Sequence, residues 1–173
     1  MLKPKIQEAF NEQINKELFS SYLYLSMAAY FESQSFMGMA QWMRIQAQEE
    51  NTHAMKFYDF VHERDGRVTL TEIAAPKIEW RGPLDAFQEA LKHEQMITGS
   101  INELVDLALA EKDHAAHSFL QWFVNEQVEE EASVQAIIDK LNLVGDNGVA
   151  LFMVDQELGQ RPAPQAAGAE SGT

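Results

Sequence analysis

Four glutamates interrupt helical patterns that are otherwise apolar, one in each of four long segments of the chain. They are Glu17, Glu50, Glu94 and Glu130, and each lies near the middle of a row of residues spaced three or four apart. A lone buried carboxylate is costly, so buried carboxylates are protonated, paired with a cationic side chain or bound to a metal. Because no lysine or arginine lies on the central parts of these rows, we favour a bound divalent cation.

A histidine adds a nitrogen ligand to this set. His53 follows Glu50 by three residues, so both side chains project from one turn of a helix. The motif Glu-x-x-His arises often by chance, but three further helices that each offer an inward-facing glutamate make the combination specific. Four carboxylates, one imidazole and no thiolate suit iron or manganese better than a closed structural zinc site.

Helices must position these side chains, and the first half of the chain predicts two of them. Between Lys5 and Arg64 the only glycine is Gly38 and there is no proline, while apolar residues recur at helical spacing. We predict a break between the two helices at residues 33–35, with Ser35 as the N-cap of the second.

Two further long helices and a short one follow in the second half. The third helix is expected to begin near Pro83, which suits a first helical turn because it lacks an N–H, and to end near residue 110. Asp113 can cap a fourth helix that continues to about residue 143. Residues 149–158 are predicted to form a short, strongly apolar fifth helix.

The linkers determine the expected topology. Short linkers place neighbouring helices antiparallel, whereas the long, mostly extended segment 65–82 can carry the chain back along the bundle. The sequence therefore predicts an all-α fold, a four-helix bundle with one long crossover between helices two and three plus a short fifth C-terminal helix. This domain is expected to span residues 1–158. Residues 159–173, rich in Ala, Pro, Gly and Ser, are expected to form a disordered tail.

Composition excludes several other classes of function. The 173 residues include 27 acids against 13 bases, for a net charge of −14, so nucleic acid is not an expected partner. Cysteine is absent, which excludes a disulfide scaffold, a thiol nucleophile and Cys-ligated metal sites. The N-terminal residues lack a secretory signal, and no stretch approaches the ~18 apolar residues of a membrane helix. We therefore expect a cytoplasmic protein without a membrane partner.

Several longer motifs surround these candidate ligands, and together they are specific. Glu17 is followed by Ser-Ser-Tyr-Leu-Tyr-Leu-Ser-Met at residues 20–27, and Glu-Glu-Asn-Thr-His-Ala occupies residues 49–54. Arg-Asp-Gly-Arg-Val stands at residues 64–68, and Asn-Glu-Gln-Val-Glu-Glu-Glu at residues 125–131. From about residue 6 to residue 158, the sequence resembles the ferritins, and in particular the prokaryotic non-haem ferritins.

The resemblance implies an activity and an assembly. Ferritins act as ferroxidases: they oxidise Fe(II) with dioxygen or hydrogen peroxide at a di-iron centre within each subunit. They store the Fe(III) as a mineral inside a hollow homo-oligomeric shell of 24 subunits. The bundle with a Glu-x-x-His motif and further inward glutamates is the arrangement of ferritin-like dinuclear carboxylate proteins.

The resemblance also implies roles for individual residues. The ligands of the first iron would be Glu17, Glu50 and His53. Glu50 would bridge to the second iron, which Glu94 and Glu130 would complete.

Further positions match residues beside such a centre. Gln127 matches a glutamine next to the ligands, and Tyr24 matches a tyrosine that can supply an electron or a hydrogen bond. A third, inner-surface iron site of bacterial non-haem ferritins is matched by Glu49, Glu126 and Glu129, with Glu130 shared.

Differences between this sequence and the motifs of related families indicate which type of ferritin it resembles. Bacterioferritins carry a second Glu-x-x-His on the fourth helix, where this chain has Gln127-Val128-Glu129-Glu130. Their haem-ligating methionine is replaced here by Asn51, so haem is not expected. The positions that match the acidic three-fold channels of animal ferritins are His117 and Leu120, which leaves the iron entry route open.

Two alternative functions use the same residues. A dinuclear carboxylate oxygenase or oxidase would act on an organic substrate bound beside the metals. A plain iron-binding shell or interaction bundle would keep its core acids protonated and catalyse nothing.

Overall fold

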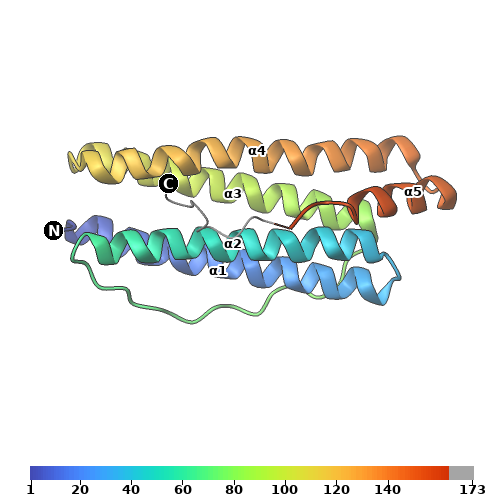
Figure 1. Ribbon diagram of the computed structural model, residues 1–173, viewed down its shortest axis with the longest axis horizontal. Helices are drawn as coiled ribbons and strands as arrows, with labels where there is room; N and C mark the ends of the chain where they lie inside the picture. Colours follow the sequence, from blue (N-terminus) through green and yellow to red (C-terminus); the bar gives the residue numbers. More distant parts are fainter. Residues whose placement is uncertain (164–173) are drawn as a thin grey trace, which may run out of the picture.

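Five α-helices and their linkers make up residues 1–163, which are the residues that the computed structural model describes. The long helices are α1 (Pro4–Ser33), α2 (Met37–Glu63), α3 (Pro83–Ala110) and α4 (His114–Val144), and the short helix is α5 (Gly148–Leu158). The long helices form a four-helix bundle, and α5 packs on α2 and α4 at one end (Figure 1). The predicted all-α bundle with a short fifth helix is confirmed. No helix within residues 1–163 is both long and apolar enough to span a membrane.

Local sequence explains most helix boundaries. Pro4 and Pro83 each stand in the first turn of a helix, where the missing N–H costs nothing. Asp113 caps α4, as predicted: its carboxylate accepts the N–H of Ala116 at 3.0 Å. Asn147 caps α5 in the same way.

The prediction for Ser35 is wrong. The residue before α2 is Phe36, which makes no side-chain cap, and Ser35 has a φ of 65°, in the left-handed region. This conformation ends α1, since the N–H of Phe36 returns to the carbonyl of Phe31 at 2.9 Å. Ser35 therefore reverses the chain after one helix instead of capping the next.

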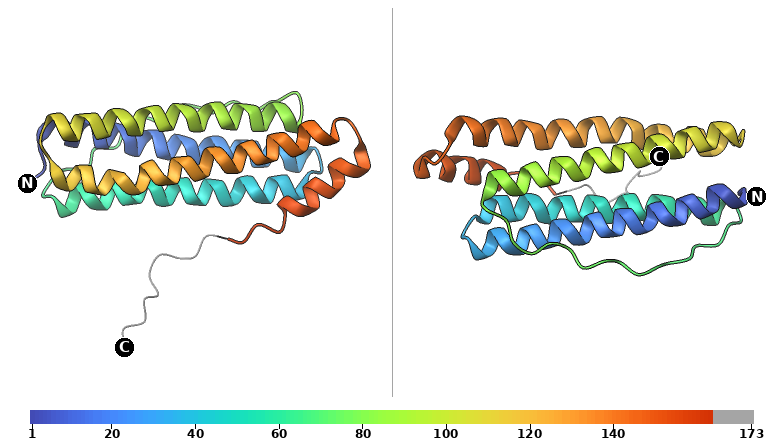
Figure 2. Two further views of the ribbon diagram at one scale, coloured as in Figure 1. Left: turned by 90° about the horizontal axis from the view of Figure 1, so that it is seen from above. Right: turned by 180° about the vertical axis from the view of Figure 1, so that it is seen from behind.

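The long connection between α2 and α3 runs the length of the bundle over α1, as Figures 1 and 2 show. Polar side chains of α1 bind its backbone. Gln7 accepts the N–H of Arg67 at 2.8 Å, and Asn11 donates to the carbonyl of Arg67 at 3.1 Å. Asn15 donates to the carbonyl of Glu72 at 2.9 Å. These bonds fix the crossover that the sequence predicts.

The core consists of two apolar clusters separated by a polar layer. One cluster contains Phe10 and Phe57, and the other contains Phe31 and Met43. The buried polar residues between them come from all four long helices and are Gln13, Glu17, Ser20, Gln46, Glu50, His53, His93, Glu94, Ser100, Gln127 and Glu130. The two apolar clusters therefore stabilise the bundle, and the polar layer between them can hold functional side chains.

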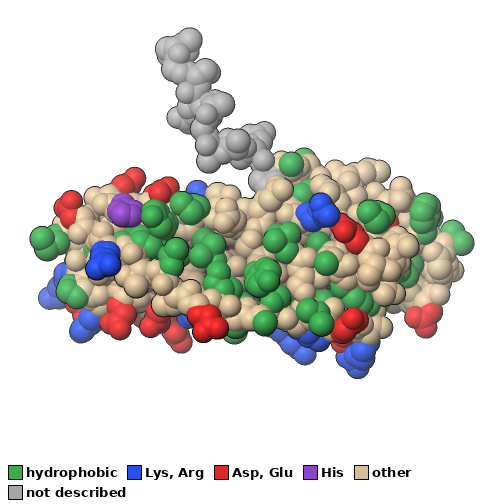
Figure 3. All heavy atoms as spheres, turned by 90° about the horizontal axis from the view of Figure 1, so that it is seen from below, with side chains coloured by type: hydrophobic (Ala, Val, Ile, Leu, Met, Phe, Trp, Pro, Cys, Tyr) green, Lys and Arg blue, Asp and Glu red, His purple; other side chains and the backbone are tan. Residues whose placement is uncertain are grey.

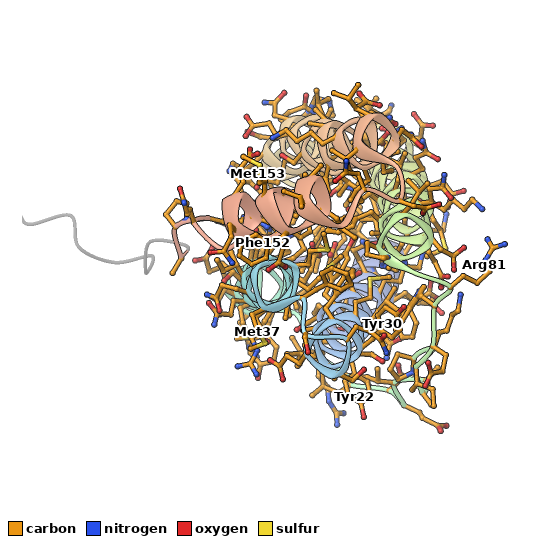
Figure 4. All side chains as sticks on the ribbon, turned by 90° about the vertical axis from the view of Figure 1, so that its right-hand side faces the viewer. Tyr22, Tyr30, Met37, Arg81, Phe152 and Met153 are labelled. Carbon is orange, nitrogen blue, oxygen red and sulfur yellow. The ribbon has the colours of Figure 1, made fainter. Side chains whose placement is uncertain are left out.

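Helix α5 packs closely against the start of α2, and a glycine makes this approach possible. A Cβ at Gly38 would lie 1.6 Å from the carbonyl oxygen of Asp155, so only glycine permits this approach. The buried carboxylate of Asp155 also accepts the N–H of Met39 at 2.9 Å. Figure 4 shows α5 lying across this end of the bundle. This packing fixes where the chain leaves α5.

Of the predicted tail, residues 159–163 are described and pass beside α2, as the dark red segment in Figure 1 shows. Residues 164–173 lie outside the described part of the chain.

Candidate metal centre

The five predicted core ligands meet in the polar layer. α1 provides Glu17, α2 provides Glu50 and His53, α3 provides Glu94, and α4 provides Glu130; all are buried. Two groups could each hold a cation, with candidate ligand atoms within 4.8 Å of one another. The first group is Glu17, Glu50 and His53, and the second is Glu50, Glu94 and Glu130. Glu50 belongs to both groups, so its carboxylate could contact a cation in either one.

Glu17 has an oxygen without a partner. Gln13, one turn earlier on α1, donates to Oε1 at 2.7 Å, whereas Oε2 is buried and accepts no hydrogen bond from any donor within residues 1–163. A buried acceptor left unpaired costs about 1–3 kcal/mol, so this atom favours a ligand that the protein alone does not provide. A cation between Glu17, Glu50 and His53 would satisfy it.

One glutamine orients two of the carboxylates. The amide nitrogen of Gln46 donates to Oε2 of Glu130 at 2.6 Å and to Oε1 of Glu50 at 3.2 Å. The other oxygen of Glu50 lies 3.5 Å from Nδ1 of His53. The two carboxylates are thus held facing each other across the centre.

Tyr24 and Gln127 both bind Glu94. The Tyr24 hydroxyl donates to Oε1, and the amide nitrogen of Gln127 donates to Oε2 at 3.1 Å. Burial, together with the nearby charge of Glu94, raises the pKa of Tyr24 well above its ordinary value. Tyr24 therefore stays a protonated donor, and both residues are placed to orient this carboxylate.

The electrostatics of the centre favour neutralisation by a cation. Burial is the largest cause that raises the pKa of Glu17, Glu50 and Glu94, and neighbouring carboxylates add to it. The same causes raise the pKa of Glu130 to about 8, with Glu94 the main neighbour. A raised pKa favours the protonated form of each carboxyl in the metal-free protein, so a metal competes with protons when it binds.

The three residues predicted for an inner-surface site are brought together only in part. Glu126 is half-buried, with an oxygen 3.9 Å from Nε2 of His53, and it forms a third candidate cation group with His53 and Glu130. Glu49 instead pairs with Arg161. Glu129 is exposed and belongs to none of the three groups found among the described residues.

Three residues of the site are missing from the sequence predictions: Gln13, Gln46 and Arg161. Both glutamines stand four residues before a ligand glutamate, a spacing that places them one helical turn away, so this signal could have identified them. Arg161 had no such signal, because it lies in a Pro- and Ala-rich segment that predicts disorder.

Comparisons with known proteins agree with this geometry. Residues 7–144 match the family model described as a ferritin-like domain. A bacterial non-heme ferritin of Bacteroides fragilis (strain 638R) is 45% identical over 161 residues, covering 93% of this chain and all of that protein. A bacterial non-heme ferritin of Escherichia coli O157:H7 is 42% identical, covering 91% of this chain and 96% of that protein.

Solved structures show the same likeness. An open-pore ferritin from the hyperthermophilic archaeon Archaeoglobus fulgidus superposes with a TM-score of 0.93 at 51% sequence identity, covering 94% of this chain and all of that one. A form of the A. fulgidus ferritin engineered to be closed gives a TM-score of 0.94 at the same identity, covering 95% of this chain and all of that one.

Proposed function

This chain belongs to the ferritin family, and we propose that it stores iron after oxidising Fe(II) to Fe(III) at the buried centre. The observation that carries the proposal is the convergence of four carboxylates and one imidazole from four helices, with one carboxylate oxygen left unpartnered. Hard oxygen ligands with one nitrogen suit iron, and their negative charge stabilises the ferric product more than the ferrous substrate.

In the proposed reaction, two Fe(II) ions bind as substrates and each loses one electron. Dioxygen accepts the two electrons with two protons and becomes hydrogen peroxide. Alternatively, hydrogen peroxide accepts them with two protons and becomes two water molecules. Glu50 belongs to both candidate groups and would contact both ions, so one oxidant could take both electrons. Tyr24 and Gln127 keep Glu94 oriented through the hydrogen bonds that they donate to its two carboxylate oxygens.

The iron leaves the centre toward the inner surface in this proposal. Glu126 extends the ligand set from His53 and Glu130, and Glu49 and Glu129 are proposed to complete a third site there. Haem has no role in the proposal.

A hollow shell of 24 copies is the proposed assembly. Phe152 and Met153 on α5 are 63% and 66% exposed, and Tyr22 on α1 is 51% exposed (Figure 4). Apolar side chains are also spread over the face seen in Figure 3. Large apolar side chains exposed on α5 and α1 are candidates for contacts with further copies of the chain, because contiguous exposed apolar surface marks sites of protein association. The cytoplasmic location stays a prediction.

Size-exclusion chromatography with aerobic Fe(II) loading separates the candidate functions. The proposal predicts a very large particle that accumulates many irons per subunit. A small oligomer holding only two irons would favour the oxygenase, which the comparisons do not support. A protein that takes up no iron would favour the structural bundle.

A further inference from the structure

Arg161 extends from the segment after α5 onto α2, beside the metal centre. Its guanidinium donates to the Gln46 side-chain oxygen at 2.8 Å and to the Trp42 carbonyl at 3.5 Å, and it pairs with Glu49. It also lies over the Trp42 ring, 4.5 Å from the centroid. The side chain is only 21% exposed, so the contact is built into the fold.

Gln46 connects the Arg161 guanidinium to two of the proposed metal ligands, Glu50 and Glu130. The single side-chain oxygen of Gln46 accepts from Arg161, so its amide nitrogen must face the other way. That nitrogen donates to Glu50 and Glu130. An amide turned by 180° would present its oxygen to two carboxylates and lose the bond from Arg161. Arg161 therefore selects the orientation of Gln46 that orders the centre.

Glu49 is the other partner, and its carboxylate also interacts with the charge of Glu126. A guanidinium stays charged at every relevant pH, so Arg161 is a permanent cation at the edge of the acidic cluster. A metal ion that uses Glu49 must compete with that cation for the same oxygens.

We propose that Arg161 is a displaceable cation at the third iron position: it neutralises Glu49 in the iron-free subunit and must leave when iron binds there. The inference rests on the proposed function, since it presupposes that iron passes from the centre to Glu49. It assigns the C-terminal segment a regulatory role, because the third position opens only when Arg161 moves.

Anaerobic Fe(II) titration of the assembled protein tests the proposal by metal binding, without turnover. Arg161→Gln removes the charge and replaces the guanidinium with a shorter, neutral amide. We expect the third Fe(II) per subunit to bind about tenfold more tightly in this variant, as expected for loss of one charge-assisted contact. Arg161→Lys, which keeps the charge, should stay within about threefold of the unmodified protein. Arg44→Gln, which loses an exposed arginine paired with Glu32, is the matched control and should change nothing.

Tryptophan fluorescence in the same titration reports on Arg161 when every protein also carries Trp122→Phe. Trp122 is replaced because its ring centroid lies 5.4 Å from that of His53, a member of the third candidate cation group. We expect the third Fe(II) to change the emission of the protein with no other substitution as the guanidinium leaves Trp42. The change should be absent in Arg161→Gln and in Trp42→Phe. If the first two Fe(II) bind normally and third-site affinity and emission match in all proteins, the Arg161 proposal is overturned. If the first two Fe(II) do not bind at all, the proposed function itself fails.

Discussion

Replacing Glu130 with glutamine should stabilise the iron-free protein while slowing the proposed oxidation of Fe(II). The substitution keeps the shape of the side chain but removes a carboxyl whose pKa burial and Glu94 raise to about 8. It also removes the repulsion that this group exerts on its carboxylate neighbours. A site selected for metal binding is destabilised when empty, so a neutral isostere relieves that cost.

The sign and size of the stability change follow from the difference between the pKa of Glu130 in the folded chain and its pKa in the unfolded chain. Below pH 4.5, Glu130 is protonated in both the folded and the unfolded chain, so its ionisation does not reduce the free energy of unfolding. As pH rises toward 8, the Glu130 carboxyl ionises in the unfolded chain but not in the folded chain. The free energy of unfolding therefore falls over this pH range. Between pH 5.5 and 8.5 the loss is roughly 3 kcal/mol, at about 1.4 kcal/mol per pKa unit. For a chain of this size, it corresponds to a melting-temperature difference of about 6–12 °C.

Differential scanning calorimetry of the iron-free proteins at the two pH values measures this effect. Glu130→Gln should melt higher than the unmodified protein, and the gain should be much larger at pH 8.5. Asp139→Asn, which removes an exposed acid from the same helix, is the control and should shift neither value by much. In stopped-flow oxidation, Glu130→Gln should lose at least about tenfold of the rapid phase. A lower melting temperature at pH 8.5, or an equal gain at both pH values, would show that the Glu130 carboxyl does not destabilise the iron-free fold.

Three further changes test other parts of the structure. His53→Ala should slow rapid Fe(II) oxidation at least about tenfold while size-exclusion chromatography shows an intact shell; unchanged kinetics would remove His53 from the centre. Glu129→Ala should disturb the later phase of iron turnover more than the first two-iron step, and an effect confined to the first step would contradict its third-site role. Gly38→Ala should lower the melting temperature by displacing α5, because its Cβ would overlap the carbonyl of Asp155. Gly99→Ala is the control: its Cβ would meet no atom within 4 Å, so it should be neutral or stabilise the protein by about 0.5–1 kcal/mol. Equal effects of the two glycine substitutions would show that α5 is not seated through Gly38.

The sequence was sufficient to predict where the glutamates would meet. Helical spacing identifies the inward face of each segment, and an acid on that face conflicts with burial, so Glu17 and Glu94 could be selected without coordinates. The crossover followed from the length of the linker. These features depend on local periodicity, which a single sequence records.

Other features depend on how distant segments approach each other, and the sequence does not record this. Gln46 is important because its amide reaches a carboxylate on α4, and Arg161 because α5 carries it back to α2. Ser35 was assigned by residue type, but the conformation at that position is determined by the end of the preceding helix. The same limit applies to Glu49, whose partner is 112 residues away in sequence.

Anomalous X-ray diffraction at the iron absorption edge, on crystals soaked anaerobically in Fe(II), would locate the iron itself. We expect two iron peaks inside each bundle. One should lie among Glu17, Glu50 and His53, and the other among Glu50, Glu94 and Glu130. Iron found only on exposed acids, with none in the polar layer of the core, would show that the buried carboxylates are not the iron-binding centre.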